Sequence, residues 1–285
     1  MTETLALPRT GRFCPSRFRI GAVATLVLLL VGFVSIVWTP YPVTNLDVGS
    51  VLQAPGGAHW LGTDQLGRDV LSLIMKGILT SFVVSAVAVF IGAVIGVPLG
   101  WIAKSWPGLP DKAIGALGEA LLTFPPLLLA AILAAVAGPG ILNIMLAIGL
   151  SVAPAFLRTT RDGLLAIERL DYVAAARLAG TGRVETVRRH VLPNLSPLLL
   201  AQIFAQLATG VMAEAALGFV GLGVQPPASS LGLLLRDAQS YASVAPVPLM
   251  LGGLSLIAIV LAVTSAALGL RDGLAAYLRR VGDEP

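Results

Sequence analysis

The sequence predicts an all-α integral membrane protein with six transmembrane helices. Hydrophobic residues make up 56% of the chain and charged residues 12%, whereas a soluble domain has about 25% charged residues. The mean hydropathy is +0.88. The apolar residues also form long uncharged runs, several of which exceed the roughly 18 residues needed to cross a bilayer.

Two of the apolar runs are longer than a single span. Residues 113–157 contain only one charged residue and are long enough for two spans, with Gly138-Pro139-Gly140 as the turn between them. Residues 194–235 should hold one span and a re-entrant or interfacial piece after Gly221-Leu222-Gly223. The predicted organisation is a tail at 1–19, a first transmembrane helix at 20–39, an outer segment at 40–76, a five-helix core at 77–270 with a second outer segment at 224–245, and a C-terminal tail at 271–285.

The basic residues predict the orientation. Six spans place both termini on one side, and all but three of the 19 basic residues then fall on that same side. The exceptions are Arg68, Lys76 and Arg236. Because cytoplasmic loops carry an excess of Lys and Arg, we expect both termini to be cytoplasmic.

Three other interpretations are disfavoured. An N-terminal signal peptide would have a shorter apolar core and a clean small-x-small cleavage site, so we expect a retained helix. Cys14 is the only cysteine, which excludes a disulfide framework. The net charge of +4 comes from basic residues scattered between spans, which argues against nucleic-acid binding.

The first outer segment contains a distinctive polar stretch, residues 59–72. Asp69 is suited to cap the helix that enters the bilayer, and Trp60 is suited to the membrane interface. The stretch is either an interfacial cap or a surface that meets an external partner or shapes the mouth of a pathway. His59 and His190 fall on opposite sides of the membrane, so no metal site is expected. The candidate outer-face residues are Trp60, Gly62, Asp64, Gly67, Arg68 and Asp69.

Two acidic residues fall within predicted spans. A carboxylate there should face the bundle interior or a water-filled path. Glu119 lies near a helix start, which favours a packing role. Glu214 is deeper and either forms a structural hydrogen bond or lines a pathway, together with Gln202 and Gln206, which have helical spacing with Thr209.

A charged stretch from Asp171 to Pro193 interrupts the apolar sequence. Residues 171–179 have helix-forming composition, Gly180-Thr181-Gly182 supplies a turn, and residues 183–191 fit a second short helix that Pro193 should break. Such an element must project into water, with a face available to a soluble partner. The chain has no phosphate-binding loop, nucleophile elbow, zinc motif or paired carboxylate site. Any driving energy must therefore come from a partner or an ion gradient.

The charged stretch resembles the coupling loop, or EAA loop, of permease subunits in bacterial ATP-binding-cassette importers. It has Ala174-Ala175-Ala176, then Gly180, then His190-Val191-Leu192-Pro193 at that family's spacing. Ala174 stands where the family has Glu, and His190 stands where it has a hydrophobic residue. Asp171, nearby on the same predicted helix, is a candidate substitute for the missing acid.

The resemblance extends from about residue 18 to the end and is to the peptide/nickel subfamily. It rests also on His59 to Ser72, Phe124-Pro125, Gly138 to Gly140, Glu214 to Pro227 and Leu270 to Leu274. One departure is Leu231, where that subfamily has Trp.

The resemblance implies a type I importer permease fold in the bacterial inner membrane. The implied partners are a second homologous permease, two ATPases that bind ATP and Mg²⁺, an external solute-binding protein and the lipid bilayer. This chain would bind no cofactor and would be non-catalytic, and its loop at 166–193 would fit a groove of one ATPase. The implied coupling residues are Asp171, Tyr172, Ala174, Ala175, Ala176, Arg177, Gly180, Gly182, Arg188, Leu192 and Pro193.

We therefore expect a permease subunit of an ATP-driven importer of peptides or peptide-like solutes. The same type of complex could instead import chelated nickel, opines or another small solute. A proton-coupled secondary transporter acting through Glu119 and Glu214 would show inverted repeats, and none is seen. A membrane-embedded enzyme would need ionisable residues clustered at one depth, and none are seen.

Overall fold

The structure is a computed structural model that describes residues 15–106, 108–138, 140–168 and 182–282. These residues form helices and connecting loops, and the described part contains no strand beyond an isolated bridge between Thr63 and Asp69. The elements are α1 (Pro15–Val37), η1 (Val48–Ser50), α2 (Val70–Ser105), α3 (Leu109–Thr123), α4 (Pro126–Ala137), α5 (Ile141–Glu168), α7 (Arg183–Thr186), η2 (Val187–Val191), α8 (Leu192–Val220), α9 (Leu231–Gln239) and α10 (Val247–Gly282). The prediction of an all-α membrane fold is confirmed.

Five helices are long and apolar enough to cross a membrane: α1, α2, α5, α8 and α10. A sixth span results if α3 and α4 are counted together, although their axes meet at 88°. The break falls at Pro125 and Pro126, because proline has no backbone N–H to continue the helical ladder. The predicted turn at 138–140 lies between α4 and α5, where Gly138 has a φ of +80°.

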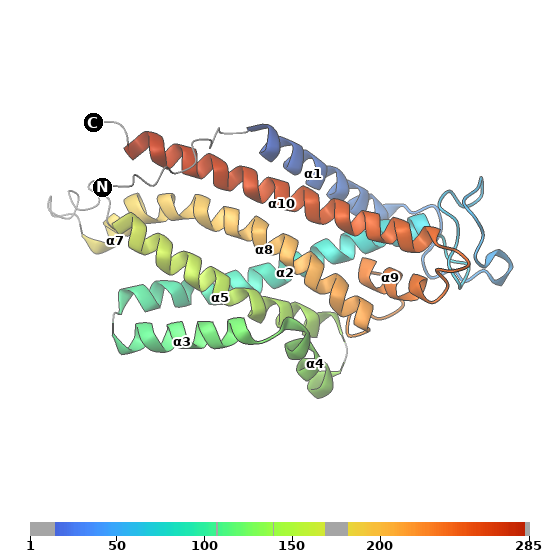
Figure 1. The fold of residues 1–285 in the computed structure, drawn as a ribbon, viewed down its shortest axis with the longest axis horizontal. Coiled ribbons are helices and arrows are strands. Elements are labelled where there is room, and N and C mark those ends of the chain that lie inside the picture. The colour runs from blue at the N-terminus through green and yellow to red at the C-terminus, as the bar shows by residue number, and fades with distance from the viewer. Residues whose placement is uncertain (1–14, 107, 139, 169–181, 283–285) are drawn as a thin grey trace, which may run out of the picture.

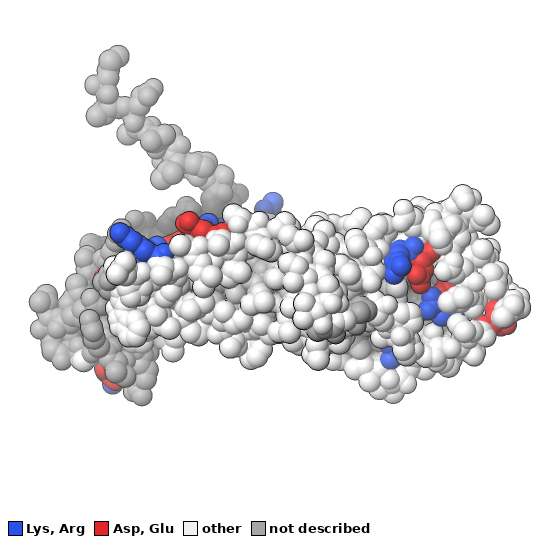
Figure 2. Space-filling model, turned by 90° about the horizontal axis from the view of Figure 1, so that it is seen from below, with Lys and Arg blue, Asp and Glu red and all other residues white. Residues whose placement is uncertain are grey.

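The helices form an elongated bundle with two distinct ends (Figure 1). We call the end where α1 begins and α10 finishes the terminal end, and the end that carries residues 38–69 and α9 the loop end. Charged side chains gather toward both ends of the face in Figure 2, and a broad uncharged belt separates them. This distribution is expected of a bundle whose middle lies in hydrocarbon.

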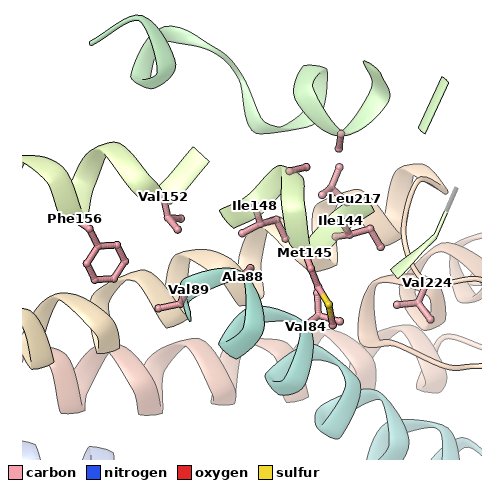
Figure 3. Packing of buried hydrophobic residues seen from close by; sticks show 12 residues of the cluster. Val84, Ala88, Val89, Ile144, Met145, Ile148, Val152, Phe156, Leu217 and Val224 are labelled. Atoms are coloured by element: carbon pink, nitrogen blue, oxygen red, sulfur yellow. The ribbon is translucent and has the colours of Figure 1, made fainter. Parts of the chain in front are cut away.

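Helices α2 and α5 pack together through small residues. Gly92, Gly96 and Gly100 lie four residues apart and are all buried in α2. A Cβ on Gly96 would overlap the carbonyl oxygen of Ala153 in α5. Without side chains at these positions the two backbones approach closely, which favours van der Waals contact between helices in a bilayer. Figure 3 shows the adjoining apolar core, in which Val84 and Ala88 of α2 lie near Ile148 of α5.

Several helix ends can be compared with the sequence. Helix α2 begins at Val70, directly after Asp69, the cap that the sequence predicts, and α10 continues to Gly282, through residues that belong to the predicted C-terminal tail. Pro193 does not break the helix as expected. It lies in the first turn of α8, directly after η2, a π-helical turn in which the Leu192 N–H donates to the Val187 carbonyl. The wider turn accommodates the proline, whose ring would clash with a regular preceding turn.

Candidate functional site

The loop end is organised around the buried carboxylate of Asp64. Its Oδ1 accepts hydrogen bonds from the backbone N–H groups of Leu66 and Arg68 at 2.8 and 2.9 Å. Its Oδ2 accepts one from Arg68 Nε at 2.7 Å. Gly67 completes this turn with a φ of +72°, and a Cβ there would overlap the carbonyl oxygen of Asp47. The carboxylate therefore fixes both the turn and the guanidinium.

Arg68 connects this turn to α9. Its Nη2 donates to Asp237 Oδ2 at 3.3 Å, although the two residues are 169 positions apart in the chain. Tyr241 is buried nearby, and burial raises the pKa of its hydroxyl, as do the carboxylates of Asp64 and Asp237. The hydroxyl therefore stays protonated at physiological pH. Arg68 thus joins the first and second outer segments.

Asp69 caps α2, as the sequence predicts. Its Oδ2 accepts hydrogen bonds from the backbone N–H of Ser72 and from the Ser72 hydroxyl, at 2.8 and 2.7 Å. His59 Nδ1 lies 3.1 Å from Asp69 Oδ1, and the His59 ring is 4.4 Å from the ring of Tyr41. His59 therefore supports the cap. In the described part of the chain, no three His, Cys, Asp or Glu residues are grouped so as to hold a metal ion.

Trp60 and Gly62 complete the predicted outer-face set. Trp60 is 64% exposed, so its indole is free to contact headgroups or a partner protein. Gly62 has a φ of +79° and lies against the carbonyl of Gln53. The structure therefore gathers the predicted residues on one loop, which contacts α9 through Arg68.

Glu214 is fully buried between α8 and α2. The hydroxyl of Ser81, also fully buried, donates to Glu214 Oε2 at 2.7 Å. One turn away, Gly210 of α8 packs against Ser85 of α2. This geometry supports the structural hydrogen bond among the two expected roles. Gln202 and Gln206 are partly exposed, and no hydrogen bond joins either of them to Glu214 within the described residues.

Replacing Glu214 with Ala is expected to lower the free energy of unfolding by about 2–4 kcal/mol. The change leaves a cavity and removes the acceptor of a buried hydroxyl. Glu214→Gln keeps the size of the side chain and an oxygen acceptor for Ser81, so it should retain most of the stability. Thermal unfolding of the purified proteins in detergent compares the two. Equal losses in both variants would contradict the hydrogen-bonding role.

The predicted coupling loop is only partly described. Asp171, Tyr172, Ala174, Ala175, Ala176, Arg177 and Gly180 lie outside the described residues. Gly182 is exposed, Arg188 lies in η2, and Leu192 and Pro193 begin α8 with exposed side chains. Glu185 and Arg189 form an ion pair one turn apart. The exposed positions of Gly182, Leu192 and Pro193 leave this segment open to contact by another protein.

The described part of this segment is anchored to the bundle through a small apolar core. Val191 is 2% exposed and packs with Leu195 against Leu164 and Ile167 of α5. Gly163 of α5 also lies against the Leu195 side chain. A force applied to η2 would therefore reach both α5 and α8.

Two ion pairs join helices at the terminal end. Arg161 of α5 donates to both carboxylate oxygens of Asp111 in α3, at 2.7 and 2.8 Å. Lys104 of α2 contacts Glu168 of α5 at 2.7 Å. The sequence marked Arg161 and Lys104 as topology signals, but it gave no sign of their partners.

The Arg161–Asp111 pair is expected to contribute about 0.5–1 kcal/mol, because both side chains are partly exposed. Asp111→Lys alone should therefore lower the unfolding temperature by about 2–4 °C. The exchange Asp111→Lys with Arg161→Asp should recover most of that loss. If the unfolding temperature of the double variant falls by the sum of the decreases in the two single variants, the pair contributes nothing.

The chain is similar to proteins of one transport class. The sequence profile of the family "Binding-protein-dependent transport system inner membrane component" matches residues 96–276. The glutathione transport system permease protein GsiD of Escherichia coli O6:K15:H31 is 33% identical over 265 residues, which cover 92% of this chain and 88% of that protein. The di/tripeptide transport system permease protein DppC of Pseudomonas aeruginosa is 38% identical over 214 residues, which cover 75% and 71%.

Solved structures show the same fold. An inward-facing MetNI methionine ABC transporter matches with a TM-score of 0.58 and 22% identity, covering 68% of this chain and 93% of that chain. An amino acid ABC transporter with histidines matches with a TM-score of 0.56 and 16% identity, covering 73% and 94%. At these identities the likeness concerns the fold, and it agrees with the type I importer permease fold predicted from the sequence.

Proposed function

The chain belongs to the family of binding-protein-dependent transport system inner membrane components, and from this membership we propose that it imports peptides or peptide-like solutes. It is a multi-pass permease subunit of an ATP-binding-cassette importer in the bacterial inner membrane. The observation that carries the peptide assignment is the similarity to glutathione and di/tripeptide permeases, which extends over most of the chain.

Such a permease works with ATPases and with an external binding protein. We propose two ATPases, which alone bind ATP and Mg²⁺ and perform the chemistry, and a second homologous permease as the heterodimer partner. The terminal end would lie in the cytoplasm and the loop end outside. The bias of basic residues supports this orientation.

The coupling role of residues 166–193 is supported by the connections of their described part. The segment around η2 continues directly into α8 and packs against α5 through Val191. Closure of the ATPases would thus displace both helices as rigid rods and change the access of the pathway.

Gln202 and Gln206 are proposed to line that pathway. Both residues are partly exposed on α8, within a predicted membrane span, whereas Glu214 of the same helix is fully buried. A primary amide is costly in hydrocarbon, so a polar path or a second permease is a more favourable neighbour than lipid. Glu214, in contrast, is assigned to the packing of α8 against α2.

Reconstitution tests this function. The two permeases and two ATPases are reconstituted in proteoliposomes, with ATP inside the vesicles and the binding protein outside. Complexes whose cytoplasmic side faces the vesicle interior should then take up di- and tripeptides or glutathione. Uptake should stop when the ATPases are omitted. Uptake without ATPases, driven by a proton gradient, would contradict the proposal and favour a secondary transporter. Uptake of chelated nickel in place of peptides would keep the class of complex and overturn the peptide assignment.

A further inference from the structure

A cleft of about 360 Å³ lies between α3 and α5. Four exposed charged residues that line it form no ion pair with another residue in the described part of the chain: Lys112, Glu119, Arg158 and Asp162. Both helices belong to candidate membrane spans, where a charge without a partner is costly. Each of the four charges is therefore expected to have a partner.

Two contacts fix the register of α3 and α5, which are antiparallel. In the first contact, Asp111 pairs with Arg161; in the second, further along α3, Gly118 lies against the Leu157 side chain. The next residue on each helix is turned by about 100° and displaced by about 1.5 Å along its own helix. In antiparallel helices these two residues lie on the same side of the interface, about 3 Å apart along the axis.

This register places charges of opposite sign across the cleft from each other. Lys112 of α3 and Asp162 of α5 directly follow the first contact. Glu119 of α3 and Arg158 of α5 directly follow the second. All four residues line the same cleft, as this geometry requires. Each charge on α3 thus has its natural partner on α5, and only the width of the cleft separates them.

Helix α3 is held loosely enough to move. Gly118 is its only buried residue. The helix begins after Gly108, which has a φ of +112° and supplies no side-chain cap, and it ends at the break before Pro126. Gly115 lines the cleft, and a Cβ there would meet no atom within 4 Å, so α3 has room to approach α5. Few buried contacts and a break at each end are properties of a segment that moves easily.

We propose that α3 closes onto α5 during the transport cycle, and that Lys112 then pairs with Asp162 and Glu119 with Arg158. An exposed ion pair favours the state in which it forms by about two- to fivefold. Two such pairs are enough to bias the closure and weak enough for it to be reversed in each cycle.

The closure rests on the proposed function, because α5 is connected to the coupling segment. Val191 at the end of η2 packs against Leu164 and Ile167, which lie on α5 within two turns of the cleft. A displacement of η2 by the ATPases would therefore move α5 relative to α3. The Asp111–Arg161 pair, already formed in the structure, is the pivot of this movement.

Cross-linking across the cleft tests the closure. In the complete complex, Cys14→Ser removes the only cysteine of this chain, and Lys112→Cys with Asp162→Cys supplies a reporter pair. A short bifunctional thiol reagent is added to the nucleotide-free complex and to the complex trapped with ATP and vanadate. The cross-linking rates in the two states should differ at least about fivefold, the upper value for one ion pair.

Variants of the remaining pair test what favours closure. In the reporter background, Glu119→Gln should slow the faster of the two rates about two- to fivefold. Glu119→Arg alone should slow it as well, and the exchange Glu119→Arg with Arg158→Glu should restore it. The matched control is Lys104→Cys with Glu168→Cys, because these side chains already touch across α2 and α5. This control pair should cross-link equally in both states and should not respond to Glu119→Gln.

Equal cross-linking of the reporter pair in both states would overturn the inference, and this comparison needs no change at Glu119 or Arg158. A Glu119→Gln rate equal to that of the reporter alone, or an exchange variant as slow as Glu119→Arg, would overturn the pairing. If ATP-dependent peptide uptake persists while the reporter rates are equal, only the closure is wrong. If the unmodified complex takes up no peptide, the proposed function fails, and the reporter rates still decide whether the cleft closes.

Discussion

Gly96→Leu is expected to abolish the folded permease. Any side chain at this position would run into the backbone of α5, because the missing Cβ would already overlap the Ala153 carbonyl oxygen and lie 2.7 Å from Phe156 Cβ. Neither neighbour can rotate away, since one is backbone and the other is the Cβ of Phe156, which is fixed by the backbone and carries a fully buried ring. We expect a destabilisation of about 3 kcal/mol or more, the upper range for overpacking. Size-exclusion chromatography of the membrane extract should show aggregate in place of a monodisperse peak.

The matched control for this variant is Gly57→Leu. Gly57 has no atom within 4 Å of an added Cβ, so the same increase in volume should be accommodated. A monodisperse Gly96→Leu protein with an unchanged unfolding temperature would contradict the close packing of α2 on α5.

Gly180→Val is expected to abolish ATP-driven uptake while membrane insertion is preserved. The proposal assigns Gly180 to the turn between the two short helices of the coupling loop, and a β-branched residue would resist the backbone angles of such a turn. Proteoliposome assays should show uptake reduced to background. ATP hydrolysis should either continue without transport or be absent because the ATPases fail to assemble.

Gly57→Val supplies the same substitution at the loop end, where an added Cβ meets no atom within 4 Å, and should retain uptake. Co-purification of the ATPases distinguishes loss of coupling from loss of assembly. Normal uptake by the Gly180→Val complex would contradict the proposal that this loop couples ATP hydrolysis to transport.

Much of the fold follows from local composition. Long uncharged runs predict the spans, and Gly138 and Asp69 mark a turn and a cap that the structure contains. The 88° bend was not predicted, although Pro125-Pro126 is visible in the sequence. Hydropathy measures whether a segment tolerates lipid, and it contains no information about the angle between two apolar pieces.

The contacts of the candidate sites were largely beyond prediction. Glu214 meets Ser81 across 133 residues, and Arg161 meets Asp111 across 50. Each pair depends on which helices become neighbours and on their rotation about their own axes. Neither property follows from periodicity when a helix is apolar on all sides.

The bend between α3 and α4 also concerns the lipid around the protein. Of this pair, only α3 runs along the bundle, and its 15 residues measure about 22 Å, while the hydrocarbon core of a bilayer is about 30 Å thick. The five other spans, of 23 to 36 residues, are all long enough to cross that thickness, so a span that is too short occurs only at α3, on one side of the molecule. Bilayers with shorter acyl chains should reduce this mismatch. Uptake measured in lipids of increasing acyl-chain length should therefore be greatest in bilayers thinner than those that fit the long helices α2 and α10.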